Sequence, residues 1–119
     1  MLDPISLLSS KTYMALRVKQ KQRRDAQHMF IMLVCVRAFL RNVLRSIESG
    51  ELPERAWLNA IERVLKLAES SVGRKAVKKF GVDWTQALPL LEIGASSHRA
   101  AAQIRTKRLP QWAAKMRRG

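Results

Sequence analysis

Three arginines, Arg37, Arg41 and Arg45, are spaced four residues apart. On a helix this spacing places them in one slowly drifting row, with each step about 6 Å along the axis. A planar guanidinium makes bidentate contacts to phosphate, and the pitch of the row resembles the phosphate repeat of a nucleic-acid strand. Such contacts position a strand without reading its sequence. The alternative is a solvated helix face, neutralised in part by the acids that follow it. These acids are Glu48, Glu51 and Glu54.

Basic residues gather in three further stretches, and such densities disfavour simple ion pairing. The candidates nearest the N-terminus share one helical stripe and are Arg17, Lys21 and Arg24. Those of the second stretch almost encircle one short turn and are Arg74, Lys75, Lys78 and Lys79. Those of the C-terminal stretch are Arg105, Lys107, Arg108 and Lys115. Together with the three spaced arginines, these residues are the candidate contacts to a nucleic-acid backbone.

Other site chemistry has little support. His28 and His98 lie 70 residues apart, with no cysteine or carboxylate at ligand spacing beside either, so we expect no metal site. The glycines form neither a phosphate-binding loop nor a dinucleotide fingerprint. Five of the nine acids lie between Glu48 and Glu69 among basic neighbours, as ion-pair partners do. We therefore expect no enzyme and no cofactor.

Length and composition indicate that these candidate contacts belong to one small, strongly basic domain. The chain has 119 residues, of which 47% are apolar, and 23 Lys and Arg against 9 Asp and Glu leave a net charge of +14. We expect a single helical domain over 1–119, with basic segments at 10–28 and 97–119. A surface of this charge attracts polyanions.

The only cysteine, Cys35, lies in an apolar run and has no partner for an intramolecular disulfide. The N-terminus lacks the basic and apolar regions of a signal peptide, and the apolar run is too short to span a membrane. These features predict a cytoplasmic protein.

The elements that must position the candidate basic residues are all expected to be helices, because no stretch of the sequence alternates apolar and polar residues as a strand does. We expect an all-α, compact bundle of about five or six helices with a long basic N-terminal helix. Ser9 or Ser10 caps a first helix that meets no Gly or Pro before Gly50. That length, about 58 Å, exceeds a small globule. We therefore expect a break near Arg23–Asp25 or a projecting basic half.

A second helix is expected to begin at Pro53–Glu54 and to end at Gly73. Its apolar face comprises Trp57, Ile61, Val64, Leu65 and Ala68, and Glu62 pairs with Lys66 on another face. Shorter helices are expected over 74–80, after Asp83 with an interruption at Pro89, over 98–108 and over 111–118. We expect Trp57 and Trp84 in the core. Trp112 is expected to anchor its helix, with stacking on a base as the alternative.

The run from Met29 to Val34 is apolar on every helix face and must be enclosed on all sides. The helix is either wrapped by the others or meets other protein subunits through the segment Met29–Val36.

Three functions fit these features. The first is a non-enzymatic protein that binds nucleic-acid backbone, RNA or DNA, as a structural subunit of a nucleoprotein complex. The second is a helix-turn-helix regulator, with two short helices within Ser70–Ala87. The third is a peripheral membrane protein or protein-binding adaptor.

In size, helical content and basic surface, the chain resembles the small helical subunits of CRISPR effector (Cascade-like) complexes. The features that carry the resemblance are the long first helix with its three spaced arginines and the basic segment Arg74 to Lys79. The resemblance implies a subunit that lines the backbone of the assembly and contacts guide RNA or DNA strands without catalysis.

Overall fold

Every regular element of the described chain is helical. The computed structural model describes residues 3–17 and 22–118, and the side chains of residues 15–26 and 118 fall outside that description. The elements are α1 (Pro4–Arg17), α2 (Gln22–Glu48), α3 (Glu54–Glu69), α4 (Ser71–Phe80), the 3-10 turn η1 (Trp84–Ala87), α5 (Leu90–Ala95), α6 (Arg99–Gln103), the π segment η2 (Ile104–Arg108) and α7 (Leu109–Arg118). Within the described ranges there is no strand, so the all-α prediction is confirmed.

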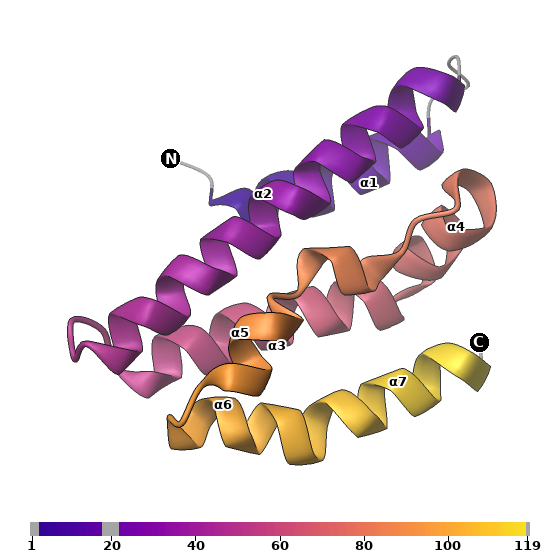
Figure 1. Cartoon of the computed structure of the whole chain (residues 1–119). Coiled ribbons are helices and arrows are strands. Elements are labelled where there is room, and N and C mark those ends of the chain that lie inside the picture. The colour runs from indigo at the N-terminus through magenta and orange to yellow at the C-terminus, as the bar shows by residue number, and fades with distance from the viewer. Residues whose placement is uncertain (1–2, 18–21, 119) are drawn as a thin grey trace.

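The long first helix is divided in two. α1 ends at Arg17, α2 begins at Gln22, and α1 lies alongside α2 (Figure 1). Residues 23–25, where a break was expected, lie within the first turn of α2, and α1 packs beside α2 and does not project. Nor do Ser9 and Ser10 cap the first helix, because Asp3 accepts from the Ser6 backbone N–H at 2.8 Å and starts α1 about two turns earlier.

α2 runs the length of the molecule. Its 27 residues span about 40 Å, and the molecule measures 44 × 34 × 19 Å. Its buried face repeats at helical spacing and comprises Met29, Leu33, Val36, Leu40, Leu44 and Ile47. Because packed helix axes lie 8–10 Å apart, a body 19 Å thick has room for about two layers of helices. α2 is therefore covered on one side only.

α3 forms the other wall of the core. Trp57, Ile61, Val64, Leu65 and Ala68 are all buried, as the periodicity predicts. Trp84 is 2% exposed, which confirms it as a core residue, and Trp112 is 5% exposed, as expected of a residue that anchors its helix and not of one that stacks on a base. Beyond Gly50, where φ is +85°, the chain reverses direction into α3.

Gly73 does not end α3, as the sequence suggested. α3 ends at Glu69, where Ser70 caps the next helix by accepting from the Gly73 backbone N–H. Gly73 lies inside α4 and packs against the last turn of α3. A Cβ at this position would lie 2.2 Å from the Leu67 carbonyl oxygen. Glycine is therefore needed where α4 approaches α3 closely. The Gly73 carbonyl also accepts a hydrogen bond from the Trp84 indole at 3.1 Å.

The two C-terminal helices that the sequence predicts are one rod. The backbone at Gln103, Ile104 and Leu109 is right-handed helical throughout, so α6, η2 and α7 run on without a break. Pro110 lacks an N–H, and its ring would clash with the carbonyl four residues earlier. The π segment, in which the Leu109 N–H bonds to the Ile104 carbonyl, widens the helix there and accommodates the ring.

Asp3 fastens the start of α1 to α3. Its carboxylate accepts from both terminal nitrogens of Arg63, at 2.9 and 3.3 Å, and Arg63 also donates to the Ser6 hydroxyl at 2.7 Å. The Arg63 hydrogen bonds lower the pKa of Asp3 from 3.8 to about 2. The pair therefore stabilises the charged form of Asp3.

We predict that Gly73→Ala destabilises the protein by about 2 kcal/mol or more, because the new Cβ meets backbone atoms that cannot rotate away. Urea denaturation measures the change. Gly94→Ala is the control, since a Cβ there meets nothing within 4 Å and alanine favours the helix by up to about 1 kcal/mol. Equal stability of the two variants would contradict the close approach.

We predict that Asp3 makes stability depend on acid pH. Because its folded pKa, about 2, is below the unfolded value of 3.8, its contribution is present above about pH 4 and is lost as the pH falls to about 2. Asn keeps the cap and removes the charge. The difference in unfolding free energy between the parent and Asp3→Asn should therefore be largest above pH 4 and shrink towards pH 2. A constant difference across this range would contradict the prediction.

Candidate nucleic-acid interface

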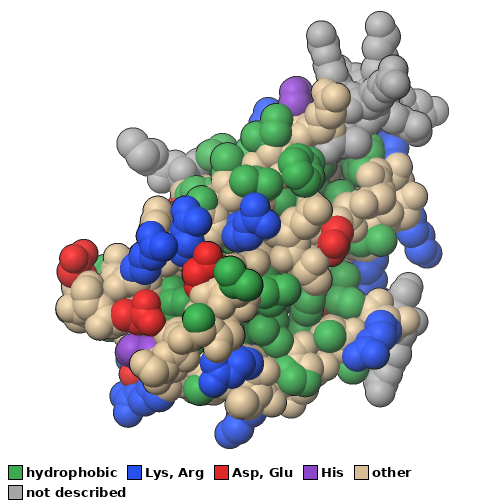
Figure 2. Space-filling model, in the orientation of Figure 1, with side chains coloured by type: hydrophobic (Ala, Val, Ile, Leu, Met, Phe, Trp, Pro, Cys, Tyr) green, Lys and Arg blue, Asp and Glu red, His purple; other side chains and the backbone are tan. Residues whose placement is uncertain are grey.

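The arginine row, Arg37, Arg41 and Arg45, lies on the side of α2 that faces away from the core. Arg37 and Arg45 are exposed, while Arg41 is half-buried and its Nε has no hydrogen-bond partner in the described structure. Figure 2 shows Lys and Arg side chains over the lower half of α2 and hydrophobic side chains over its upper half. The outward surface of α2 is thus cationic towards its C-terminal end and apolar towards its N-terminal end.

Two of the three acids expected to neutralise the row, Glu48 and Glu54, are engaged elsewhere. Glu48 accepts from the Ser96 hydroxyl at 2.6 Å, and Glu54 pairs with Arg99 and lies 3.9 Å from the His98 ring. Among the side chains that the structure describes, no carboxylate lies within 4 Å of the guanidinium nitrogens of the row. The expected partial pairing with Glu48, Glu51 or Glu54 is therefore wrong, whereas Arg37 and Arg45 do lie on a solvated face.

The α4 cluster, Arg74, Lys75, Lys78 and Lys79, has one member with an internal bond. The Arg74 Nε donates to the Glu69 carbonyl at 3.0 Å and helps to close the end of α3. The three lysines are exposed, and none has an ion pair with a described carboxylate. The Lys79 ammonium lies 5.4 Å from the centre of the Phe80 ring.

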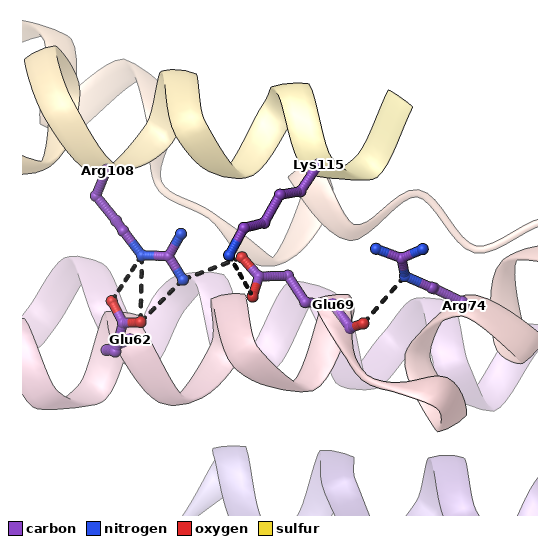
Figure 3. A network of polar contacts seen from close by, with 5 residues as sticks. All are labelled: Glu62, Glu69, Arg74, Arg108 and Lys115. Atoms are coloured by element: carbon purple, nitrogen blue, oxygen red, sulfur yellow. Dashed lines mark hydrogen bonds and ion pairs between the residues drawn. The ribbon is translucent and has the colours of Figure 1, made fainter. Parts of the chain in front are cut away.

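The C-terminal candidates mostly hold the fold together. Arg105 reaches back to the end of α5 and donates to the Ile93 carbonyl at 2.9 Å. Arg108 donates to both oxygens of Glu62 and bonds to Glu69 at 3.0 Å, while the Lys115 ammonium lies 3.9 Å from Glu69 (Figure 3). These contacts fasten η2 and α7 to α3.

The hydrogen bonds that Arg108 donates to Glu62 lower the pKa of Glu62, and the same bonds raise the pKa of Arg108. Both groups stay charged near neutral pH. The expected helical pair of Glu62 with Lys66 is absent, because Glu62 faces Arg108 instead. Of the four C-terminal candidates only Lys107 is exposed with neither an ion pair nor a side-chain hydrogen bond to a described residue.

The N-terminal candidates cannot be placed in this surface. Arg17 ends α1 and Arg24 lies in the first turn of α2, but their side chains fall outside the described part of the chain, as does all of Lys21.

The apolar run on α2 is enclosed on one side only. Met29 and Leu33 are buried, whereas Phe30 and Ile31 are 51% and 55% exposed. The interpretation that the other helices wrap α2 is therefore wrong. An apolar strip remains uncovered beside the arginine row.

The helix-turn-helix interpretation of Ser70–Ala87 does not match the structure. Its second element, η1, is a four-residue 3-10 turn, and Trp84 and Ala87 in it are buried. No exposed second helix is present there to enter a groove of DNA.

A groove lies between α1 and α3, outside the sites that the sequence predicts, and Lys66 lines it together with a row of hydroxyl side chains. The signal for it is the spacing on α1 of Ser6, Ser9, Ser10 and Tyr13, which places all four on one helix face.

The described residues contain no cluster of three or more metal-ligating side chains, and no helix among them is long and apolar enough to cross a membrane. Comparison with protein-family models, with curated proteins and with solved structures finds no match for this chain.

We predict that Arg108→Gln lowers the unfolding free energy by about 2 kcal/mol, because Glu62 and the 16%-exposed Glu69 lose their main partner. Arg117→Gln is the matched control. Arg117 is exposed and donates only to the Ala113 carbonyl of its own helix, so its loss should change stability by less than about 0.5 kcal/mol. Urea denaturation of both variants measures the difference, and similar losses would show that the network does not fasten α7.

Proposed function

We propose that this protein is a non-enzymatic, cytoplasmic subunit of a nucleoprotein complex that binds the sugar-phosphate backbone of RNA or DNA. The arginine row of α2 is its principal contact, and the lysines of α4 are a second. The small helical subunits of CRISPR effector complexes, which the chain resembles, have a role of this kind.

The observation that supports the proposal most is the unequal pairing of the cations. Arg99 and Arg108 have carboxylate partners, whereas Arg37, Arg41 and Arg45 have none among the described residues. Like charges held in one row repel each other, so the arrangement raises the energy of the free protein. A phosphate strand along the row replaces that repulsion with charge-assisted hydrogen bonds.

The geometry favours backbone contact over recognition of base sequence. The side chains of the row are guanidinium groups on consecutive turns of one helix, with about 6 Å between steps. Arginines in such a row take one phosphate each and carry no sequence information. We therefore infer that binding is sequence-tolerant and strongly dependent on salt.

The uncovered apolar strip of α2 supports a second contact, with a neighbouring protein subunit. Phe30 and Ile31 are half-exposed on the same helix as the arginine row. A subunit that covers them removes apolar surface from water and fixes the direction of the row in an assembly. A second copy of this chain is disfavoured because each copy carries +14.

We predict that replacing Arg37, Arg41 and Arg45 together by glutamine weakens binding to a single-stranded oligonucleotide. The slope of log affinity against log salt should fall in magnitude by about two to three units, because each phosphate contact contributes a little under one unit. Fluorescence anisotropy at several salt concentrations measures both quantities. Glutamine is a good helix former, so thermal melting should show a folded protein.

A control variant removes the same number of positive charges at positions outside the arginine row. Arg55, Arg99 and Arg117 are exposed arginines on α3, α6 and α7, and replacing them by glutamine also removes three charges. If this variant loses as much affinity and slope as the row variant, binding depends on net charge alone. If both variants stay folded and bind as the parent does, the row is not the contact.

A further inference from the structure

A groove separates α1 from α3 and extends to the start of α4. Its volume is about 640 Å³, within the range of sites that hold small molecules or parts of larger ligands. Its apolar lining residues are Leu67 and Val72, which are partly exposed, and Ile5, which is buried. The Asp3–Arg63 pair, which also holds Ser6, joins α1 to α3 beside it and commits the Arg63 guanidinium.

The α1 side of the groove carries hydroxyl groups. Ser9 and Ser10 are exposed, and neither hydroxyl has a hydrogen bond with a described residue. A hydroxyl both donates and accepts, so it can meet the edge of any nucleobase. An apolar side chain from a partner protein would leave these groups without partners when it covered them.

An aromatic ring and one cation complete the groove. Tyr13 is 47% exposed and lies one turn beyond Ser9 and Ser10 on the same helix face. Across from α1, the Lys66 ammonium has no ion pair in the described structure, because Glu62 is held by Arg108. A flat apolar ligand with polar edges and an attached anion fits this set of groups.

The groove continues into the cations of α4. Val72, Lys75 and Lys79 recur at intervals of three and four residues, so they form one strip along that helix. Both lysines are exposed. A strand that leaves the groove past Val72 therefore meets two further cations.

We propose that the groove receives one unstacked nucleobase of a bound single strand. The base lies on the apolar surface beside the Tyr13 ring, its edge meets the hydroxyls of Ser9 and Ser10, and the adjoining phosphate pairs with Lys66. This inference rests on the proposed function, which it extends from backbone contact to single strands, because a duplex keeps its bases stacked.

A tryptophan in place of Tyr13 reports on the groove. The three tryptophans of the parent, Trp57, Trp84 and Trp112, are at most 5% exposed. Tyr13→Trp therefore adds one exposed indole, whose fluorescence a ligand in the groove can quench. A 12-nucleotide oligothymidylate should quench it, whereas an abasic strand of equal length and charge should not. Leu91→Trp, at a position 86% exposed on α5, is the control reporter and should stay unquenched by both strands.

Affinity tests the same inference without a reporter. The parent should bind oligothymidylate about tenfold more tightly than the abasic strand, because stacking of one base on an aromatic side chain has about this effect. Tyr13→Leu should abolish the difference, and Tyr13→Phe, which keeps the ring, should preserve it. Thermal melting verifies that each variant is folded.

The outcomes separate the two proposals. Equal affinity for both strands with no quenching at position 13 overturns the groove and leaves backbone binding intact. Equal quenching at positions 13 and 91 also overturns it, because the base is then not localised. If neither strand binds at low salt, both proposals fail, and a protein segment becomes the occupant to seek.

Discussion

The shortage of carboxylates is the constraint on which the rest of this structure depends. Nine acids face 23 basic residues, so most cations cannot have an acidic partner. Asp3 joins α1 to α3, Glu54 joins α3 to α6, and Glu62 and Glu69 join α3 to the C-terminal rod. Each of these acids holds two elements together, and none lies beside the arginine row of α2. Because these few carboxylates are used to join helices, the arginine face of α2 has no acidic partner among the described residues.

The thinness of the body produces the other notable surface. With about two layers of helices, α2 buries one face and presents the opposite face to solvent. Along that outward face, apolar residues such as Phe30 and Ile31 precede the arginines. An apolar surface of this kind reduces the solubility of a free chain, while the net charge of +14 opposes self-association. The two effects together favour association with a different protein or a polyanion over association with a second copy of this chain.

Local pattern predicted the elements whose structure is decided locally. α3 and its buried face follow from helical periodicity. Gly50 follows the end of α2 with positive φ, as expected, and the short helix expected to end at residue 80 does end there, before Gly81 at positive φ. The sequence predicts helix ends at Gly73 and near Pro110, yet each residue has a tertiary reason to lie inside a helix. For Gly73 this is the approach of α4 to α3, and for Pro110 it is the π segment. Neither is visible in the residues on either side.

The division of the cations into structural and available groups also required the structure. Arg108 and Lys107 are adjacent in sequence, yet one is 18% exposed between two glutamates and the other is exposed to solvent. Their roles depend on where α3 lies, at a separation of about 40 residues in sequence. Charge density therefore located the basic stretches, but it did not distinguish cations that fasten helices from cations that remain unpaired.

This division bears on how a polyanion acts on the protein. A ligand stabilises the folded state only to the extent that it binds the folded chain more tightly than the unfolded chain. The unfolded chain carries the same 23 basic residues, so total charge supplies no preference for either state. The preference arises where folding places cations close together without neutralising them, as on α2 and α4. Where folding supplies carboxylates, as at Arg108, it reduces the attraction for the polyanion. The positions of the few acids thus decide which surface of this basic protein gains affinity through folding.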